Sequence, residues 1–587
     1  MPDPRLQYNQ RLLDRQSRAQ QLDVLHYRLA NGRLLAFACI VISVFVAVAR
    51  PAGTGLLLLS GLAFAILLLW HRRVQTRWDR ANRAVGFYQE GLHRLDGTWI
   101  GRGLQGADYL DPQHPYLRDL DIFGKGSLFE YLCIARTRPG QDRLANWLAS
   151  GASPDQIGER QEAVCELVDC LDLREDLATL YAGRHTLSAP VIAAWGQAPL
   201  RLTSNGMRLL AALLGLSGVA TLVYWLASWD PRPLAIVVLV QQLFKSWPGR
   251  ELGCVLRDVE PIRRDICNLS AFLARLQQES FHRPLLVRLW EPLRHSPPSQ
   301  ALAELEGLIE MLDARRNHFI SPLVFVSLST LQLACQVERW RGRYGKHVEA
   351  WMESMAQFEA LSCLAGFAWE NPGYCWPQVS LSANGVQAEG LGHPLLGPEC
   401  VVNDLALGEV SVWIVSGSNM AGKSSLLRAL GSNVVLAMAG GPVRARSFLL
   451  EPLCPGASIQ LADSLVGGIS RFYAEILRLR QIVEMAQAKP RLLFLLDEIM
   501  GGTNSHDRRI GAEAVVRSLV HKGALGLVTT HDLALTAIVD DLPGQAGNVH
   551  FEDQLEEGTM SFDYHLRPGP VTRSNALQLM RAVGLEV

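Results

Sequence analysis

One short motif constrains the fold of this chain more than any other feature. Residues 417–424 read Gly-Ser-Asn-Met-Ala-Gly-Lys-Ser, which has the form G-x-x-x-x-G-K-[ST] of a phosphate-binding loop. The apolar run 410–415 before it predicts a buried strand, and the apolar stretch 425–436 after it predicts a helix. Chance is the alternative explanation, but the flanking strand and helix argue against it. The motif therefore indicates an α/β nucleotide-binding domain.

The loop gives roles to its residues. Its glycines allow consecutive backbone N–H groups to turn toward phosphate oxygens. Lys423 brings a positive charge to the terminal phosphates, and the Ser424 hydroxyl is suited to ligate Mg²⁺. The residues expected to contact a nucleotide are Gly417, Ser418, Asn419, Met420, Ala421, Gly422, Lys423, Ser424 and Ser425.

A second predicted strand, 491–496, leads directly into two carboxylates, Asp497 and Glu498. Asp497 is expected to hold Mg²⁺, directly or through water. Glu498 points differently and is expected to polarise the attacking water as a general base. Because a strand that ends in Asp-Glu is common, this assignment depends on its pairing with the upstream loop.

Two further polar positions are candidates for phosphate contacts. The apolar run 524–530 predicts a strand followed by His531. A lone histidine is usually structural, but one at the end of a neighbouring parallel strand can reach a γ-phosphate, so we expect a sensor role. Gly468 and Ser470 lie in a glycine turn at a helix start. Ser470 is suited to contact phosphate there, although the residues alone favour an ordinary N-cap.

Two apolar runs near the N-terminus, 34–49 and 55–70, predict a transmembrane helical hairpin. Each run measures only about 24 Å, against a hydrocarbon core of about 30 Å, so flanking residues must help it to cross. Arginines flank both outer ends, which predicts that both ends face the cytoplasm at the inner membrane, together with the nucleotide-binding domain. The alternative is a buried hairpin in a large helical domain.

A second apolar pair lies within 206–250 and predicts another transmembrane hairpin. Its arms are 209–226 and 234–244, and tryptophans lie near their ends. The second arm is short and contains Gln241 and Gln242, which makes this the weaker prediction. A buried core hairpin is again the alternative.

Composition limits the classes of function. The formal net charge is -1, so any contact with DNA must come from local patches rather than a global basic field. The Cys count is 11, with no Cys-x-x-Cys pair and no Cys/His metal spacing. This pattern indicates reduced thiols in a cytoplasmic protein without a metal cluster.

Several motifs together resemble the ATPase domain of the MutS family, the DNA mismatch-repair branch of the ABC-type ATPases. They are the loop 417–425, Leu496-Asp-Glu-Ile-Met-Gly-Gly-Thr-Asn504, Thr530-His-Asp532 and the segment around Ser470. Upstream, 130–148 and 157–167 resemble the helical core of that family, and 358–374 resembles its lever helix. The resemblance covers about residues 117–200 and 250–587.

The resemblance implies a homodimer with composite sites that use ATP and Mg²⁺. In such a site the loop, Asp497 and Glu498 belong to one subunit, whereas Gly468 and Ser470 come from the other. Family members also stack adenine on a ring near the C-terminus, a role that Tyr564 could fill.

The expected fold is therefore multidomain, with an N-terminal transmembrane hairpin, an all-α core and lever that carries a second apolar hairpin, and a C-terminal α/β ATPase domain of ABC type. A cluster of helix breakers at 370–377 separates the helical and α/β parts. The expected segments are amphipathic helices and the first hairpin over 1–110, helical core over 111–205, the second hairpin over 206–250, helical core and lever over 251–380, and the ATPase domain over 381–587.

The resemblance does not cover the whole family plan. Residues 1–110 show no mismatch-reading domain with a Phe-x-Glu wedge, the interval between the helical halves is short for a DNA clamp, and a nuclease domain is missing. Direct mismatch recognition is therefore the least supported part of the family's function.

Two hypotheses follow. In the first, a membrane-anchored MutS-like ATPase drives a DNA-engaging clamp in mismatch repair or damage sensing. In the alternative, the same ATPase acts on a protein or lipid partner in the membrane. A transporter is a third option, but two short hairpins whose apolar runs carry no charge make a poor pathway.

Overall fold

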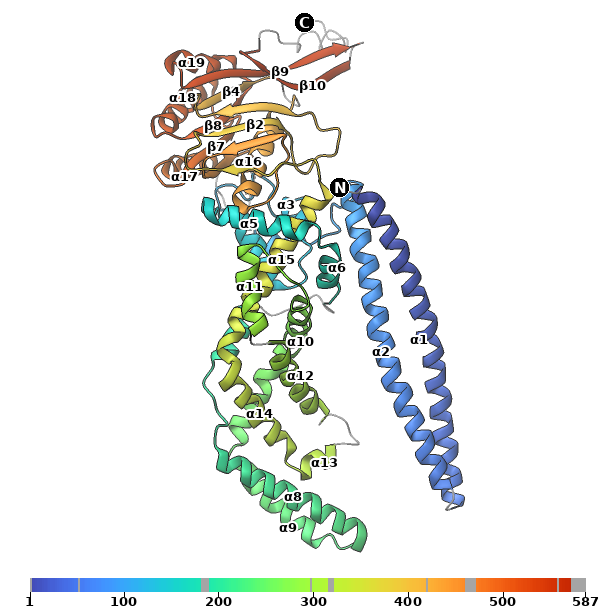
Figure 1. Ribbon diagram of the computed structural model, residues 1–587. Coiled ribbons are helices and arrows are strands. Elements are labelled where there is room, and N and C mark those ends of the chain that lie inside the picture. Colours follow the sequence, from blue (N-terminus) through green and yellow to red (C-terminus); the bar gives the residue numbers. More distant parts are fainter. Residues whose placement is uncertain are drawn as a thin grey trace. The chain divides into compact units, whose positions relative to one another are not determined.

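The computed structural model describes residues 3–50, 53–180, 189–295, 298–314, 321–418, 421–459, 471–556 and 559–571 (Figure 1). The chain divides into two compact units. The first contains Met1–Ile134, Leu144–Leu171 and Leu361–Val587, and the second contains Ala135–Arg143 and Asp172–Ala360. A helical N-terminal region and a C-terminal part built on β-sheets agree with the fold class expected from the sequence.

A six-stranded sheet organises the C-terminal part of the first unit. Its order is β10-β9-β4-β8-β7-β6, and every neighbouring pair is parallel except β9 with β10. The strands are β4 (Val412–Ser416), β6 (Leu453–Ser458), β7 (Arg491–Asp497), β8 (Leu525–Thr530), β9 (Ala546–Glu556) and β10 (Thr559–Pro568). β7 and β8 are nearly continuous apolar runs because helices cover both faces of a parallel sheet.

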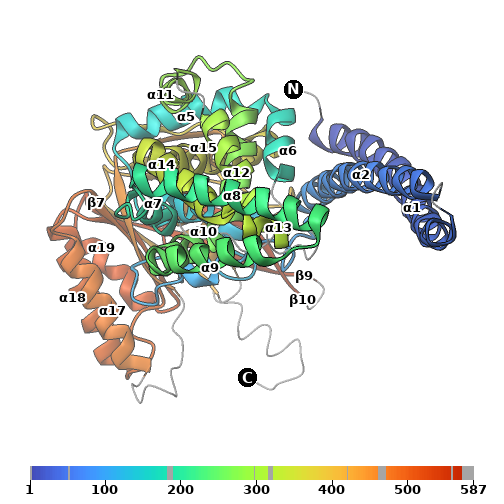
Figure 2. The same ribbon diagram turned by 90° about the horizontal axis from the view of Figure 1, so that it is seen from below.

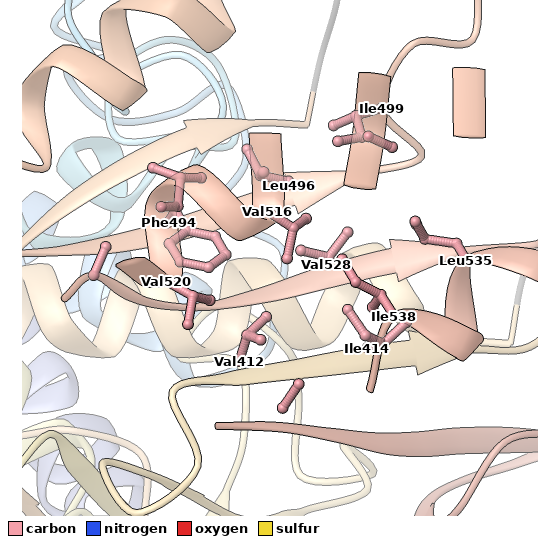
Figure 3. Packing of buried hydrophobic residues seen from close by; sticks show 14 of the residues in the cluster. Val412, Ile414, Phe494, Leu496, Ile499, Val516, Val520, Val528, Leu535 and Ile538 are labelled. Atoms are coloured by element: carbon pink, nitrogen blue, oxygen red, sulfur yellow. The ribbon is translucent and has the colours of Figure 1, made fainter. Parts of the chain in front are cut away.

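Helices pack on both faces of this sheet. On one face, α17 (Arg471–Met485), α18 (Ser505–His521) and α19 (Ile538–Asp541) enclose an apolar cluster that includes Phe494 and Val528 (Figure 3). The other face receives α16 (Lys423–Ala439), where a side chain added at Gly431 would come within 2.8 Å of Leu495. This close approach packs the middle of α16 against β7.

A smaller sheet of four strands lies in the same unit, in the order β1-β5-β2-β3. Its strands are β1 (Gln378–Val379), β2 (Val386–Leu391), β3 (Asn403–Leu407) and β5 (Ser447–Leu450). The connection between β2 and β3 forms part of the wall of the cavity described below. The short helices α3 (Leu128–Leu132) and α5 (Pro154–Val168) also belong to this unit.

Two long helices form the N-terminal hairpin of the first unit. α1 (Pro4–Ala49) has 46 residues and α2 (Gly53–Leu95) has 43, so each continues far beyond its apolar run. The expected separate flanking helices are therefore the polar halves of α1 and α2. At the polar end, Glu370 accepts hydrogen bonds from Tyr8 at 3.0 Å and from Arg94 at 2.8 and 2.6 Å. This buried cluster ties the hairpin to the end of α15.

The second unit is helical. Its elements include α6 (Leu171–Leu180), α7 (Ala189–Gln197), α8 (Asn205–Ser228), α9 (Arg232–Ser246), α10 (Gly249–Leu276), α11 (Pro284–His295), α12 (Pro298–Ala314), α13 (Ser321–Val326) and α14 (Ser329–Tyr344). Three helices have residues in both units: α4 (Arg138–Ala149), α6 and α15 (Val348–Glu370). The buried Glu359 accepts the backbone N–H groups of Arg136 and Thr137 at 3.0 and 3.3 Å. These bonds hold the start of α4 against α15.

Three of the described helices, α1, α2 and α8, are long and apolar enough to cross a membrane by length and composition. The expected second hairpin corresponds to α8 and α9, and α9 has only 15 residues. At about 1.5 Å per residue α9 measures about 22 Å, which is less than the thickness of a hydrocarbon core. Whether any of these helices enters a membrane stays a prediction.

Candidate functional site

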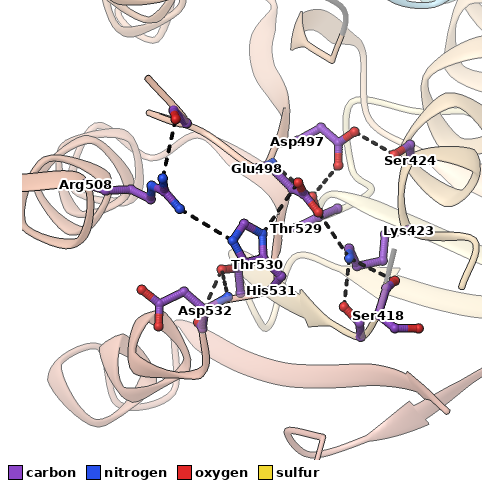
Figure 4. A network of polar contacts seen from close by, with 12 residues as sticks. Ser418, Lys423, Ser424, Asp497, Glu498, Arg508, Thr529, Thr530, His531 and Asp532 are labelled. Carbon is purple, nitrogen blue, oxygen red and sulfur yellow. Dashed lines mark hydrogen bonds and ion pairs between the residues drawn. The ribbon is translucent and has the colours of Figure 1, made fainter. Parts of the chain in front are cut away.

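The polar residues singled out in the sequence meet at one edge of the six-stranded sheet (Figure 4). β4, β7 and β8 are parallel neighbours, and their register pairs Ser416 with Thr530 and Asp497 with Thr529. The loop that follows β4, the carboxylates that end β7 and the histidine that follows β8 therefore leave the sheet at the same edge. Ligands of open α/β sheets bind at such carboxyl edges.

The lysine of the loop is almost completely buried, at 5 % exposure. Its ammonium group donates hydrogen bonds to the carbonyl oxygens of Gly417 at 2.7 Å and Ser418 at 3.1 Å. The same Nζ atom of Lys423 lies 3.3 Å from Oε1 of Glu498. The loop and the end of β7 are thus joined by one buried cation, which is the charge that a terminal phosphate would require.

Gly422 must be glycine for two reasons. Its φ of 101° is in a region that side chains disfavour, and α16 begins at the next residue. A Cβ atom at this position would also stand 3.1 Å from the ring of Tyr564. Gly422 therefore lets the backbone turn into α16 and approach the ring closely.

Ser424 and Asp497 are the candidate ligands of a divalent cation. The Ser424 hydroxyl donates to Oδ2 of Asp497 at 2.6 Å, and Thr529 donates to Oδ1 of the same carboxylate. This donor set of a hydroxyl and a carboxylate consists of oxygen atoms, as Mg²⁺ prefers, and Mg²⁺ usually keeps several waters and binds substrate phosphates. The site therefore fits Mg²⁺. Among the described residues, no group of three His, Cys, Asp or Glu side chains is suited to hold a metal ion by itself.

The backbone at Glu498 is unusual. Its φ is 45°, and that of Met500 is 62°, both in the left-handed region that residues other than glycine seldom adopt. The N–H of Glu498 donates to both the hydroxyl and the carbonyl of Thr529, at 3.1 and 3.3 Å. Strained backbone of this kind concentrates at functional sites. Here it turns the Glu498 carboxylate away from β7 toward Lys423 and His531.

His531 lies between Glu498 and an arginine from α18. Its Nδ1 atom is 3.5 Å from Oε2 of Glu498, and its Nε2 atom is 3.4 Å from Nη1 of Arg508. A guanidinium group can only donate hydrogen bonds, so Nε2 must accept from Arg508. The tautomer that satisfies both contacts carries its proton on Nδ1, facing Glu498.

A cavity of about 670 Å³ opens over these residues. Its lining includes Ser424, Ser425, Asp497, Glu498 and Tyr564, together with residues of the β2–β3 connection. The Tyr564 ring is 43 % exposed, and its φ of 56° coincides with an irregularity in the β9–β10 register. The volume is within the range of ligand pockets in proteins.

Asn403 supports the irregular segment around Tyr564. Its Nδ2 atom donates to the Tyr564 carbonyl at 3.0 Å, and its Oδ1 atom accepts the N–H of Leu566 at 2.7 Å. On the other wall, burial first and then Arg428 and Arg444 lower the pKa of His393 to about 4. His393 is therefore neutral near pH 7, and its Nδ1 atom accepts the N–H of Leu395 at 3.2 Å.

The structure brings together most of the predicted site residues. Gly417, Ser418, Gly422, Lys423, Ser424, Asp497, Glu498 and His531 share one edge of the sheet; Ser425 and Tyr564 line the cavity, and Ala421 is buried beside it. Asn419, Met420, Gly468 and Ser470 lie outside the described residues. The helix α17 begins at Arg471, directly after Ser470 in the sequence.

Sequence reasoning missed three residues that hold this site in place. Thr529 binds both Asp497 and Glu498, Arg508 contacts His531, and Asn403 supports Tyr564. Arg508 also donates to the carbonyl of Met500 at 3.2 Å and to those of Gly501 and Thr503 at 3.4 Å. Thr529 could have been found from its place at the end of a predicted parallel strand, whereas Arg508 and Asn403 carry no local signal.

Comparison with known proteins places these features in one family. Residues 413–586 match the model of MutS domain V. The DNA mismatch repair protein MutS of Streptococcus sanguinis (strain SK36) is 28% identical over 298 residues, which are 49% of this chain and 33% of that protein. The MutS protein of Shouchella clausii (strain KSM-K16) is 33% identical over 255 residues, 41% of this chain and 29% of that protein.

A plant protein shows the same similarity. The DNA mismatch repair protein MSH6 of Arabidopsis thaliana is 30% identical over 274 residues, which are 42% of this chain and 20% of that protein. This chain therefore spans a third or less of the length of these three relatives. The similarity supports the family of the C-terminal half and leaves the function of the whole chain to be inferred.

Proposed function

The C-terminal half of this chain belongs to the MutS family, and from this premise we propose that the protein is a Mg²⁺-dependent ATPase. ATP binds at the loop 417–425, Ser424 and Asp497 hold Mg²⁺, and Glu498 activates the attacking water. Two copies of the chain form each composite site, with Gly468 and Ser470 supplied by the other copy. The cycle of ATP binding and hydrolysis closes and opens the dimer.

One observation carries this proposal most directly. The ammonium group of Lys423 lies 3.3 Å from Glu498, and Glu498 lies 3.5 Å from His531. A cation for the phosphates, a carboxylate and a neighbouring histidine are groups that can assist hydrolysis of a phosphoanhydride. The Ser424 to Asp497 contact of 2.6 Å supports a cation site beside them.

The chemistry follows from these contacts. Bound phosphate oxygens replace the loop carbonyls and Glu498 as partners of the Lys423 ammonium group. Glu498 can then accept a proton from water. His531, with its proton on Nδ1, donates to the Glu498 carboxylate and orients it beside the terminal phosphate. Mg²⁺, when bound, neutralises charge on the phosphates. The cavity wall at Tyr564 provides a ring on which adenine stacks.

DNA is the proposed partner of the ATPase, in mismatch repair or damage sensing. The relatives named above are DNA mismatch repair proteins, and this inference comes to the present chain by similarity over its C-terminal half. Direct recognition of a mismatch is not part of the proposal. Binding of matched, mismatched and branched duplexes, compared at one stated salt concentration, tests this part, and absence of binding to all three would reject it.

The proposal also places the protein at the inner membrane, with its ATPase domain in the cytoplasm. The exposed apolar side chains of α1 and α2 support it, among them Phe45 at 73% and Leu58 at 75% exposure. Such side chains seldom stay in water over a long helical hairpin. They also favour the alternative function, in which the ATPase acts on a protein or lipid partner within the membrane instead of DNA.

Two substitutions test the ATPase. Glu498→Gln should retain ATP affinity within about twofold but lose about 10²–10⁴ in kcat, because a positioned general base contributes that much. Lys423→Ala should lose both binding and turnover. Glu389→Gln, at an exposed position of strand β2, is the matched control and should behave as the wild type. Equal turnover by Glu498→Gln and the wild type would reject the assignment of the base.

A further inference from the structure

The apolar hairpin of the second unit, α8 with α9, has side chains that its own unit leaves uncovered. On α8, Leu216 is 70% exposed and Leu226 is 67% exposed; on α9, Leu243 is 67% exposed. The exposed apolar residues of α8 are Leu209, Leu210, Leu213, Leu216, Val223, Tyr224 and Leu226. At about 100° per residue they cover an arc of about 200°, much wider than the stripe of about 100° that packs one protein helix on a core.

The remaining side of α8 is packed like a helix in a membrane protein. Its buried positions are the small residues Ala211, Gly215 and Gly218. A Cβ atom at Gly218 would lie 2.4 Å from the carbonyl oxygen of Val326, so α13 approaches closely. The fully buried Gln241 of α9 donates to the carbonyls of Leu214 at 2.7 Å and Val326 at 2.8 Å. Small residues and a polar amide joining helices are features of packing in lipid.

Charged and aromatic residues lie only at the ends of the hairpin. Arg208 and Lys245 stand at the open end, where Trp247 is 83% exposed. Arg232 and Trp229 stand at the turn, and Trp229 is 83% exposed. Tryptophan and long basic side chains at helix ends favour the interface between lipid headgroups and acyl chains.

The packing of α13 argues against a crossing of the membrane. α13 contacts α8 near Gly215 and Gly218, and only about 15 Å of α8 extends from Gly218 to the turn at Ser228. A crossing of about 30 Å would carry the break between α13 and α14 to the depth of the lipid tails, and Leu328 in this break has a φ of 53°. Irregular backbone at that depth is tolerated only where protein covers it, and Ser327, beside the buried Leu328, is only partly buried. α9 is also too short to return across the bilayer.

From these contacts we propose that α8 and α9 form an in-plane membrane contact: a hairpin that lies in the cytoplasmic interface of the bilayer and immerses its apolar face without crossing. α8 and α9 run side by side at the end of the second unit (Figures 1 and 2). The proposed partner of this apolar face is lipid. A bilayer can cover an arc of about 200° around α8, whereas a single partner helix would cover a narrower arc. This inference rests on the proposed attachment of the chain to a membrane.

Impermeant maleimide labelling of the full chain in vesicles of phosphatidylcholine and phosphatidylglycerol tests the topology. Asp230→Cys marks the turn of α8–α9, Ser382→Cys marks the exposed ATPase side, and Arg50→Cys marks the far side reached by α1–α2. The parent chain gives the background from its native cysteines. The proposal predicts that Asp230→Cys reacts within about twofold of Ser382→Cys and about tenfold faster than Arg50→Cys. Reaction as slow as that of Arg50→Cys would show a crossing and overturn the proposal.

A fluorophore sensitive to polarity, attached at Leu216→Cys, tests the contact itself. Its emission should shift to the blue when vesicles are added to the detergent-free protein. An unshifted emission would overturn the proposal, since water would then cover α8. The same shift without lipid would also overturn it, since another protein surface would then cover α8. Equal labelling of Arg50→Cys and Ser382→Cys would instead reject the crossing of α1–α2, while the Leu216 probe would still report on α8–α9.

Discussion

The edge of the six-stranded sheet that carries the candidate site, here called the nucleotide edge, and the hairpin α1–α2 surround their side chains in opposite ways. At the edge, Lys423, Asp497, Glu498 and His531 each contact another polar group of the same unit. Along the apolar halves of α1 and α2, large side chains such as Phe45 and Leu58 remain mostly exposed. The polar side chains named for the first region find partners within one chain, whereas the apolar side chains of the second require a surrounding that the described residues do not supply. Substitutions in the hairpin should therefore change membrane attachment without changing the ATPase rate, and substitutions at the edge should do the reverse.

The largest expected effect concerns the hairpin. Leu62→Asp combined with Ile66→Asp places two carboxylates in the apolar half of α2, where both side chains are exposed. Insertion of the two charges costs about 5–7 kcal/mol. We expect the protein to leave the membrane pellet after a salt wash while its ATPase rate in detergent stays unchanged.

The exposed Leu381 provides the control for that experiment. Leu381→Asp adds a charge to the surface of the first unit, where the leucine is 83% exposed, and should leave the pellet unchanged. Retention of the doubly substituted protein in the washed membranes would contradict the role of α1–α2 as an anchor. A fall in the ATPase rate in detergent would contradict the separation of the two regions.

A smaller effect is expected at Thr529, which joins the two carboxylates. Thr529→Val keeps the shape of the side chain but removes the hydroxyl that donates to Asp497 and accepts from the N–H of Glu498. Loss of hydrogen bonds to charged groups costs about 1.5–3 kcal/mol, so kcat should fall about 10- to 100-fold. Thr536→Val, which removes an exposed hydroxyl from the turn after β8, is the control in the same steady-state assay.

The smallest effect is expected for Arg508, which acts through His531. Arg508→Ala removes the donor to Nε2 and the bonds to the loop carbonyls of Met500, Gly501 and Thr503. We expect kcat to fall about tenfold while the KM for ATP stays unchanged, because a positioning residue affects the reaction more than binding. The neighbouring Arg509→Ala should retain the wild-type rate. A rise in KM with constant kcat would instead assign Arg508 to nucleotide binding.

How much could be predicted from the sequence differs between the two regions for a physical reason. At the nucleotide edge, the loop 417–424 and the carboxylates after β7 carry local signals, and parallel strands bring their ends together wherever the intervening chain folds. Thr529 lies opposite Asp497 because β8 is the neighbour of β7 in the sheet. The order of the strands cannot be predicted from any local pattern in the sequence. Asn403 reaches the site from a distant strand and Arg508 from the helix that follows β7, so only the tertiary structure reveals their contacts.

The hairpin shows the reverse case. Hydropathy located the apolar runs 34–49 and 55–70 but missed that α1 and α2 continue through Arg33 and Arg72 without a break. The polarity of the side chains changes there, yet Arg, Gln, Leu and Ala are all good helix formers, so the backbone has no reason to stop. For α8 and α9, hydropathy suggested a crossing pair, whereas the short length of α9 and the contacts of α13 with Gly215 and Gly218 argue for a shallow position.

The composite ATPase site is the central claim, and mixed dimers test it most directly. Glu498→Gln and Ser470→Ala chains should each be inactive alone, because each homodimer carries the same defect in both sites. In a dimer of one chain of each kind, one site combines an intact Glu498 with an intact Ser470. An equal mixture should therefore regain about a quarter of the wild-type rate of ATP hydrolysis, given random pairing in a twofold dimer. A mixture no more active than the average of the two variants would contradict the account.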